Sequence, residues 1–488
     1  MLVAALAFGA CSATGLPDVA DTNVPMDATS DVDPVDIVVA DVPVDRGPPV
    51  RPPMIQRTMP DTALETRRRA CEFGRGAWAA ETLGMDVPVG NDIPIDHVLV
   101  LMLENRSFDH YFSNLREAGQ MDAEVPARDW ANAHSDGRSV ARFHTTEMCV
   151  RDPAHGWNPV HTQYNSGAMD GFVTTNEPLG ERAMGYVDAT DIPFYYALAT
   201  TFAIGDHYFC SILGPTVPNR LYLLSGTSFG LGANTLVASD TRDTPAPTVM
   251  TLMDAAQIEW RDYSPGLRMI QYYPYYGNLR RETRPHLRNI DQLIADLAAG
   301  SLPPLSIVEP AYTGEAGVRT DEHPPGTPQA GEANAERIVR ALFASPVWRR
   351  TALFILYDEH GGFADHVAPP EACPPDGSPP VDAAGRPLSG GRFDRLGIRV
   401  PFMVISPYAR SHFVGHRNYD HSSVLRFIEA RFGLPAMTHR DANATPPYEM
   451  FDFANPPFMT PPAGLPSSRP DPAVQTRCTA LFPGSGGL

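Results

Sequence analysis

A continuous apolar run of strand length, His97-Val98-Leu99-Val100-Leu101-Met102-Leu103, stops abruptly at Glu104-Asn105-Arg106-Ser107. Its length suits a strand, and its lack of alternation suits a strand that is buried on both faces. Such strands belong to parallel sheets, in which polar residues at the carboxyl end reach the edge where ligands bind. The run therefore predicts a central strand that carries Glu104 and Asn105 to this edge.

The same pattern recurs in three later segments, residues 305–310, 353–359 and 400–406. Residues 333–343 and 422–431 carry apolar side chains at helical spacing, and Gly433 suits the end of the second helix. Strands that alternate with helices predict an α/β fold with a doubly wound, mostly parallel central sheet and helices on both faces. Polar groups that act together are then expected just beyond the carboxyl ends of the strands.

The overall composition excludes several classes of protein. The chain has 488 residues, and 43% of them are hydrophobic, which is ample for a buried core and not typical of an intrinsically disordered chain. Its 38 basic residues, all of them arginine, face 57 acidic ones, and the formal charge is −19. Because the arginines are outnumbered and scattered, we expect no binding of nucleic acid through a basic surface.

The first residues indicate the compartment and the domain organisation. Residues 1–16 are expected to form a signal or lipoprotein segment, since Phe8-Gly9-Ala10-Cys11 resembles a lipidation box with Cys11 as the acylated residue. A plain secretory signal is the alternative, so the protein is expected outside the cytoplasm, in the bacterial cell envelope or secreted.

Residues 17–55 are predicted to form a disordered acidic tether, because the stretch from 17 to 49 contains eight Asp, one Arg and many Pro. Residues 56–488 are predicted to form a single catalytic domain with long loop insertions.

Cysteine spacing points to disulfides rather than to a structural metal site. If Cys11 is lipidated, five cysteines are left, which permits two disulfides and one free thiol in an oxidising compartment. The pairing is left open by the sequence. No pair has C-x-x-C spacing, so a structural zinc site is not expected.

Two acidic clusters lie directly after predicted strands. Glu104-Asn105 follows the first strand, and Asp358-Glu359 follows another strand and precedes His360-Gly361-Gly362. Oxygen ligands at the ends of neighbouring parallel strands can converge on a hard divalent cation, and a Gly-Gly pair lets the backbone come close. Each cluster alone could be an ordinary acidic turn, but two in one chain favour a metal site.

A third cluster begins with Gly214-Pro215-Thr216-Val217-Pro218-Asn219-Arg220. Pro218 suits the first turn of a helix, so Thr216 is expected just before that helix, among unpaired backbone N–H groups and the positive end of the dipole. That position favours an anion and also favours the ionisation of a hydroxyl. Taken alone, Thr216 could be a simple N-cap.

Histidines in polar loops form the fourth feature. His155 lies in Asp152-Pro153-Ala154-His155-Gly156, and His323 lies in Asp321-Glu322-His323-Pro324. A histidine can donate to a phosphoryl oxygen or protonate a leaving group near neutral pH. For any one histidine a surface or capping role is the simpler interpretation. Only a position beside the metal site, together with the other groups, would favour a catalytic role.

Four blocks resemble, in order, the signature blocks of the bacterial phosphoesterase family, which contains non-specific phospholipases C and acid phosphatases. They are Glu104-Asn105-Arg106-Ser107-Phe108-Asp109-His110, Gly214-Pro215-Thr216-Val217-Pro218-Asn219-Arg220, Asp321-Glu322-His323-Pro324 and Asp358-Glu359-His360-Gly361-Gly362-Phe363. The resemblance extends from about Ile93 to Leu434. It implies an alkaline-phosphatase-like fold and one divalent metal ion, which could be Mg, Ca, Mn or Zn. It implies these metal-binding positions: Glu104, Asn105, Thr216, Asp358 and Glu359.

The resemblance also implies roles in the reaction. Thr216 corresponds to the nucleophile, which forms a phosphothreonine, while His155 and His323 are catalytic and, with Asn219, bind the substrate. The Thr216 block also resembles a sulfatase signature, but threonine cannot become formylglycine, so a sulfatase is disfavoured. Thr216 favours a phospholipase C that acts on phospholipids. The alternatives are an acid phosphatase acting on small phosphoesters and a non-catalytic lipoprotein that binds phosphate or lipid. A possible N-terminal lipid anchor would supply membrane contact.

Overall fold

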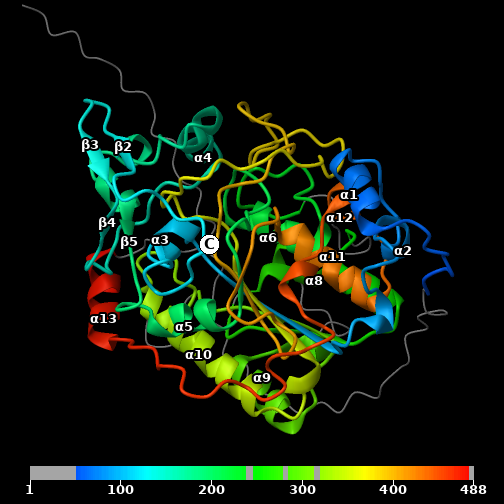
Figure 1. Cartoon of the computed structure of the whole chain (residues 1–488). Helices are drawn as coiled ribbons and strands as arrows, with labels where there is room; N and C mark the ends of the chain where they lie inside the picture. Colours follow the sequence, from blue (N-terminus) through cyan, green and yellow to red (C-terminus); the bar gives the residue numbers. More distant parts are fainter. Residues whose placement is uncertain (1–50, 238–245, 267, 278–283, 313–318, 483–488) are drawn as a thin grey trace, which may run out of the picture. The chain divides into compact units, whose positions relative to one another are not determined.

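Strand β1 (His97–Leu103) lies inside a sheet of eight strands in this computed structural model (Figure 1). The structure describes residues 51–237, 246–266, 268–277, 284–312 and 319–482. These residues belong to one compact unit, Arg46–Leu488. The predicted signal or lipoprotein segment, Cys11 and all of the predicted tether up to residue 50 lie outside the described residues.

The eight-stranded sheet contains five parallel and two antiparallel neighbouring pairs. The predicted α/β class with a mostly parallel central sheet is therefore confirmed. In order across the sheet the strands are β12 (Phe413–Gly415), β6 (Ala203–Gly205), β11 (Phe402–Ile405), β10 (Thr351–Tyr357), β1, β9 (Leu305–Val308), β7 (Trp260–Tyr263) and β8 (Leu287–Arg288). Two small sheets pair β2 (Ala131–Ala133) with β3 (Ser139–Ala141), and β4 (Phe143–His144) with β5 (Gly185–Tyr186).

The register of the central strands decides which residues meet at the edge. Strand β1 pairs in parallel with β10 along its whole length, from His97 opposite Thr351 to Leu103 opposite Tyr357. On its other side β1 pairs in parallel with β9. Because β1 and β10 end together, the residues that follow them are brought to the same edge of the sheet.

Strand β11 corrects one expectation. Residues 400–406 were expected to repeat the parallel pattern, but β11 runs antiparallel to both β10 and β6. Ser406 therefore lies at the opposite edge, where its hydroxyl donates to the carbonyl of Thr351, the first residue of β10, at 2.9 Å. A fully buried strand has the same apolar composition in either direction, so the run alone could not reveal its orientation.

Helices cover both faces of the sheet (Figure 1). They are α1 (Asp61–Arg69), α2 (Ala79–Thr82), α3 (Phe108–Phe112), α4 (Trp157–Tyr164), α5 (Pro193–Thr201), α6 (Thr216–Ser225), α7 (Val249–Ala255), α8 (Pro274–Gly277), α9 (Ile290–Ala299), α10 (Pro328–Ala344), α11 (His421–Phe432), α12 (His439–Asn443) and α13 (Pro472–Leu481). The two helices predicted from spacing are confirmed as α10 and α11. Gly433 ends α11 with φ 63°, a left-handed conformation that glycine adopts without strain.

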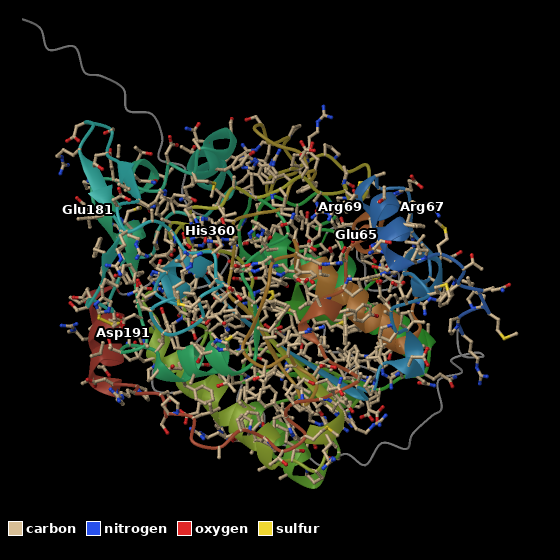
Figure 2. All side chains as sticks on the ribbon, in the orientation of Figure 1. Glu65, Arg67, Arg69, Glu181, Asp191 and His360 are labelled. Carbon is tan, nitrogen blue, oxygen red and sulfur yellow. A yellow bond between two sulfur atoms is a disulfide. The ribbon has the colours of Figure 1, made fainter. Side chains whose placement is uncertain are left out.

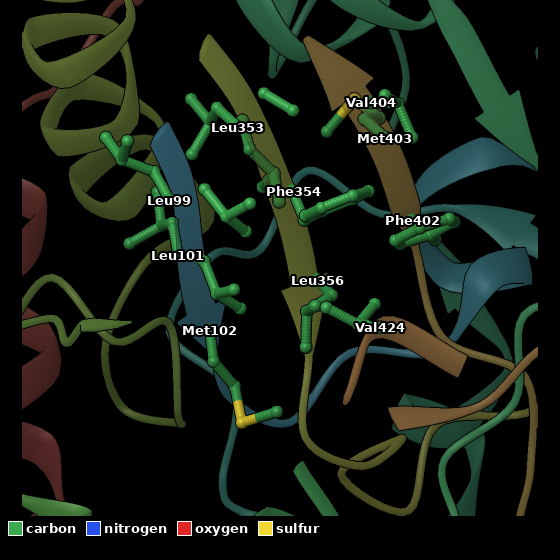
Figure 3. Packing of buried hydrophobic residues seen from close by; sticks show 14 of the residues in the cluster. Leu99, Leu101, Met102, Leu353, Phe354, Leu356, Phe402, Met403, Val404 and Val424 are labelled. Carbon is green, nitrogen blue, oxygen red and sulfur yellow. The ribbon is translucent and has the colours of Figure 1, made fainter. Parts of the chain in front are cut away.

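Apolar packing joins these helices to the sheet. Figure 3 shows the side chains of β1, β10 and β11 packed together, with Val424 of α11 against them. The ring of Phe427 on α11 meets Phe354 of β10 at 5.3 Å, which places α11 on that face. Side chains alternate between the two faces of a strand, so Tyr357, three residues after Phe354, points to the other face. There its ring packs on that of Tyr111 of α3, with the ring centroids 5.5 Å apart.

Two disulfides tie distant segments to this core, and they are Cys71–Cys373 and Cys149–Cys478. Cys210 is a buried free thiol, so the expected count of two disulfides and one free cysteine is confirmed for the described residues. Cross-links that close such long loops stabilise a fold mainly by restricting the unfolded chain. Within the described ranges, no helix is both long and apolar enough to cross a membrane.

Candidate active site

The two acidic clusters meet at the carboxyl edge of β1 and β10, as predicted. The backbone N–H of Asn105 lies 3.3 Å from Oδ1 of Asp358, and the N–H of Glu359 donates to the same oxygen at 2.7 Å. The N–H of Arg106 donates to the carbonyl of Glu359 at 3.1 Å. Glu104, Asn105, Asp358 and Glu359 are all fully buried. Segments 253 residues apart are thus joined by direct hydrogen bonds.

Close backbone packing explains why position 361, two residues after Glu359, is a glycine. Asn105 has φ 60° and Gly361 has φ 64°, so both backbones are left-handed at the point where the two segments cross. A Cβ atom on Gly361 would lie 2.4 Å from the carbonyl oxygen of Asn105, which is closer than any real contact. Glycine is therefore required at position 361 for the two strand ends to approach.

Several oxygen atoms at this edge have no hydrogen-bond partner among the described residues. They are both carboxylate oxygens of Glu104, Oδ1 of Asn105 and Oε1 of Glu359. Burial and the charge of Asp358 raise the pKa of Glu104 well above its usual value, and burial raises that of Glu359 to about 8. Unpaired buried acceptors are costly. An all-oxygen set of this kind fits a hard divalent cation.

Asp358 differs from the other predicted ligands because both of its carboxylate oxygens have partners. Oδ1 faces the two backbone N–H groups, and Oδ2 accepts from Nε of Arg220 at 2.8 Å. The guanidinium of Arg220 also lies 3.3 Å from Glu309 and 3.6 Å from Glu104. One buried arginine thus faces three carboxylates, and a fourth carboxylate, that of Glu359, faces the imidazolium of His155. The excess of negative charge is a second reason for a cation at this edge.

Thr216 begins helix α6, and Pro215 precedes it as the N-cap residue. It was expected just before the helix, and the structure moves it one position inward, a shift within the usual uncertainty of helix ends. Thr216 is buried, and Arg220 follows four residues later on the same helix face, about 6 Å along the axis. Because Arg220 bonds Asp358, the first turn of α6 points toward the carboxyl edge.

Asn219 has a structural role that the sequence did not reveal. Its Oδ1 accepts from the N–H of Ile212 at 2.9 Å, and its Nδ2 donates to the carbonyls of Gly214 and Pro215 at 2.9 and 3.0 Å. These bonds fix the loop that presents Thr216. Since both ends of the amide bind this loop, a contact with substrate stays a prediction.

The two predicted histidines lie side by side. The ring centroids of His155 and His323 are 5.6 Å apart, and Asp152 lies 3.5 Å from the first and 3.9 Å from the second. Each Nδ1 lies 2.7 Å from a backbone carbonyl, that of Pro153 or Pro324. These bonds leave Nε2 of each ring as the atom available to a ligand, and Nε2 of His155 lies 3.3 Å from Nδ2 of Asn105.

Electrostatics separates the two rings. Burial lowers the pKa of His155, but the carboxylates of Glu359 and Asp152 outweigh it and raise the value to about 9. Burial lowers the pKa of His323 well below its usual value, and the positive charges of His155 and Arg319 lower it further. Asp152, His155 and His323 also have ligand atoms that all lie within 4.8 Å of one another, so they could hold a metal ion.

Three further residues complete this region: Arg319, which the sequence analysis did not identify, and Asp321 and Glu322, which were quoted only as neighbours of His323. Arg319 donates from Nε to Asp321 at 3.0 Å, and the carbonyl of Asp321 accepts from the N–H of Glu104 at 2.9 Å. Glu322 turns the other way and accepts from the hydroxyls of Tyr111, Tyr195 and Tyr357. The loop that bears His323 is therefore held both at the carboxyl edge of the sheet and in the core.

His360, labelled in Figure 2, directly follows the acidic pair. Its Nε2 lies 2.8 Å from Oε1 of Gln163, and the side chain is fully buried. Burial, together with the charge of His155, keeps its pKa well below the usual value. We conclude that His360 is a neutral packing residue behind the site.

Comparisons with known proteins identify the family of this chain. The model of the Phosphoesterase family matches residues 95–435. Phospholipase C B of Mycobacterium tuberculosis is 32% identical over 75% of this chain and 80% of its own length, and phospholipase C A is 34% identical over 79% and 83%. The non-hemolytic phospholipase C of Pseudomonas aeruginosa is 34% identical over 75% of this chain and 58% of its own.

Among solved structures, a protein of the alkaline phosphatase superfamily from Vibrio parahaemolyticus aligns with 79% of this chain and 78% of its own, with 8% identity and a TM-score of 0.36. The family model covers more than half of the chain, and the acidic, threonine and histidine blocks all lie inside the matched range. The chain therefore belongs to the phosphoesterase family and is a hydrolase that acts on phosphoric esters.

Proposed function

We propose that this chain is an extracytoplasmic, metal-dependent phospholipase C that cleaves phospholipid phosphodiesters through a phosphothreonine at Thr216. The observation that carries the proposal is the set of unpaired buried oxygens of Glu104, Asn105 and Glu359 beside the helix that begins at Thr216. The names of the relatives support phospholipids as substrates. Two disulfides support an oxidising compartment outside the cytoplasm.

The expected metal ligands are Glu104, Asn105, Thr216, Asp358 and Glu359, and their donor atoms are all oxygens. Magnesium, calcium and manganese suit such a set, with zinc as a fourth candidate. A divalent ion bound there would supply positive charge that favours an ionised hydroxyl and neutralises a phosphoryl group.

The residues of the chain then have separate tasks. Thr216 lies at the N-terminus of α6, where unpaired N–H groups and the helix dipole favour a negative oxygen. Its oxygen attacks phosphorus, and the bond from phosphorus to the leaving alcohol breaks. The Nε2 atoms of His155 and His323 lie where one can protonate that alcohol and the other can donate to a phosphoryl oxygen. Water then hydrolyses the phosphothreonine and restores the hydroxyl.

The test compares Thr216→Ala and Thr216→Ser with the unmodified enzyme on three substrates: p-nitrophenyl phosphate, p-nitrophenyl phosphorylcholine and phosphatidylcholine. We expect the alanine variant to lose about 1,000-fold or more in kcat, because nothing replaces the nucleophile. The serine variant keeps a hydroxyl and should retain measurable turnover. Circular dichroism should be the same for all three proteins.

Mass spectrometry of enzyme that is acid-quenched during turnover of p-nitrophenyl phosphorylcholine should find a phosphorylcholine group on the peptide that contains Thr216, because nitrophenol leaves and the head group stays on phosphorus. An alanine variant that retains more than a tenth of the activity would exclude Thr216 as nucleophile. Hydrolysis of p-nitrophenyl phosphate alone would instead indicate a phosphatase. Failure to hydrolyse any of the three esters would indicate a binding protein.

A further inference from the structure

Two neighbouring cavities lie near His155. One has a volume of about 270 Å³ and is lined by Asp152 and His155. The other has a volume of about 360 Å³ and is lined by neither of those residues. Both are lined by Arg151, Leu179 and Arg182, so these residues form a shared wall. A long ligand whose polar part lies at His155 would therefore reach the second cavity by passing over this wall, past Leu179, which is 54% exposed.

Arg182 fixes this wall in place. Its guanidinium donates to the carbonyls of Arg151 at 2.9 Å and Asp152 at 3.3 Å, and on the other side to the carbonyl of Asn176 at 2.9 Å. It thereby joins the segment that carries Asp152 and His155 to the loop that carries Leu179. The wall between the cavities is thus a bonded part of the catalytic region.

The second cavity is mainly apolar. Its lining includes Phe143, Met148, Val150, Leu179, Val187 and Phe363. Leu179 is 54% exposed and Phe143 is 40% exposed, so large apolar side chains stand at its mouth. The floor is formed by Phe363, which stacks on His110 at 3.9 Å, and burial lowers the pKa of His110 so that its ring is uncharged.

The floor also connects to the loop that bears His323. Arg106 lines the cavity, and its guanidinium donates to the carbonyls of Glu322 and Gly326, the latter at 3.2 Å. Pro328, the first residue of α10, lines it as well. The apolar cavity is therefore bounded on one side by the His155 segment and on the other by the His323 loop.

We propose that this second cavity binds an acyl chain of the phospholipid whose phosphoryl group lies at His155. This inference rests on the proposed function and adds a site for the apolar part of the substrate. A phosphomonoester with a small polar group would make no use of an apolar cavity that shares a wall with the catalytic histidines. An acyl chain would bury apolar surface there at the moment its phosphate reaches the metal edge.

The experiment measures kcat/KM for dibutanoyl-, dihexanoyl- and diheptanoyl-phosphatidylcholine, each below its critical micelle concentration, with p-nitrophenyl phosphorylcholine as a substrate without acyl chains. Each methylene that enters the cavity should raise kcat/KM by about four-fold. Leu179→Asp and Phe143→Asp place a charge at the mouth from two different segments. Both should lower the ratio of the diheptanoyl to the dibutanoyl value by at least about ten-fold.

The matched control is Leu236→Asp, because Leu236 is also 54% exposed and lies outside this cavity. It should keep the chain-length dependence of the unmodified enzyme. If phosphatidylcholines are cleaved without dependence on chain length, or if both mouth variants keep the full dependence, the acyl site is wrong and the proposed function stands. If no phosphodiester is cleaved, the proposed function itself fails, and the acyl site fails with it.

Discussion

The replacement Glu322→Gln tests how the core holds the His323 loop. Glu322 is fully buried, and burial raises its pKa from 4.5 to about 7 even though three tyrosine hydroxyls donate to it. Between these two values the folded protein holds a proton that the unfolded chain has already released. The free energy of unfolding therefore falls as the pH rises from 4.5 to about 7, and it levels off above that.

The size of the effect follows from the shift. Each pKa unit corresponds to about 1.36 kcal/mol, so the full effect is about 3.4 kcal/mol, of which about 2.5 kcal/mol falls between pH 5 and pH 8. Glutamine has no such titration and resembles the protonated glutamic acid. When the pH is raised from 5 to 8, the free energy of unfolding of the variant should therefore rise by about 2.5 kcal/mol relative to that of the unmodified protein.

Urea denaturation at pH 5, 6, 7 and 8, followed by tryptophan fluorescence at one fixed metal concentration, measures this difference. The matched control is Glu336→Gln on α10, the helix that follows the loop of Glu322. At Glu336, burial is outweighed by hydrogen bonds from Ser468 and Arg340, which lower its pKa. Its contribution is lost only below about pH 4.5, so this control should give a constant difference from pH 5 to pH 8. A constant difference for Glu322→Gln as well would refute the reasoning.

Two other predictions concern the charges at the carboxyl edge. Arg220→Met leaves the carboxylates of Glu104, Glu309 and Asp358 facing one another without a positive charge. We therefore expect the free energy of unfolding, measured in urea, to fall by about 3–5 kcal/mol. A loss below about 1 kcal/mol would contradict the role of Arg220 in neutralising these carboxylates. Removal of the metal with a chelator should abolish ester hydrolysis and lower the melting temperature. At a metal concentration 1,000-fold above Kd, the free energy of unfolding should be about 4 kcal/mol higher than in the metal-free protein. If none of Mg, Ca, Mn and Zn restored either the activity or the melting temperature, the proposal of a metal enzyme would be excluded.

The sequence predicted the part of the site that lies in single uninterrupted motifs. The run 97–103 and the segment 353–359 revealed both strands, and because parallel strands end at one edge, the meeting of Glu104 with Asp358 followed from topology. The adjacency of His155 and His323 was expected only from the resemblance of the blocks to a known family. The direction of β11 could not be predicted, since a buried strand carries no pattern that distinguishes parallel from antiparallel pairing.

The missed residues are those whose role depends on contacts between distant segments. Glu322 adjoins His323 in sequence, yet its carboxylate binds tyrosines from α3, α5 and β10 and points away from the histidine. Arg220 was part of a quoted motif, but its three carboxylate neighbours come from three other segments. Local propensity and spacing contain no information about such contacts.

The charges at the carboxyl edge connect the stability of the fold with the proposed metal site. A fully compensated edge would need as many positive as negative groups. One arginine faces Glu104, Glu309 and Asp358, and the imidazolium of His155 faces Glu359, so two positive groups face four carboxylates. If only packing mattered, apolar residues at these positions would give an edge at least as stable, because buried ion pairs seldom repay their desolvation. The surplus charge therefore supports the proposed binding of a cation. Arg220 neutralises enough of it for the protein to fold, and the unpaired oxygens of Glu104, Asn105 and Glu359 remain for a cation.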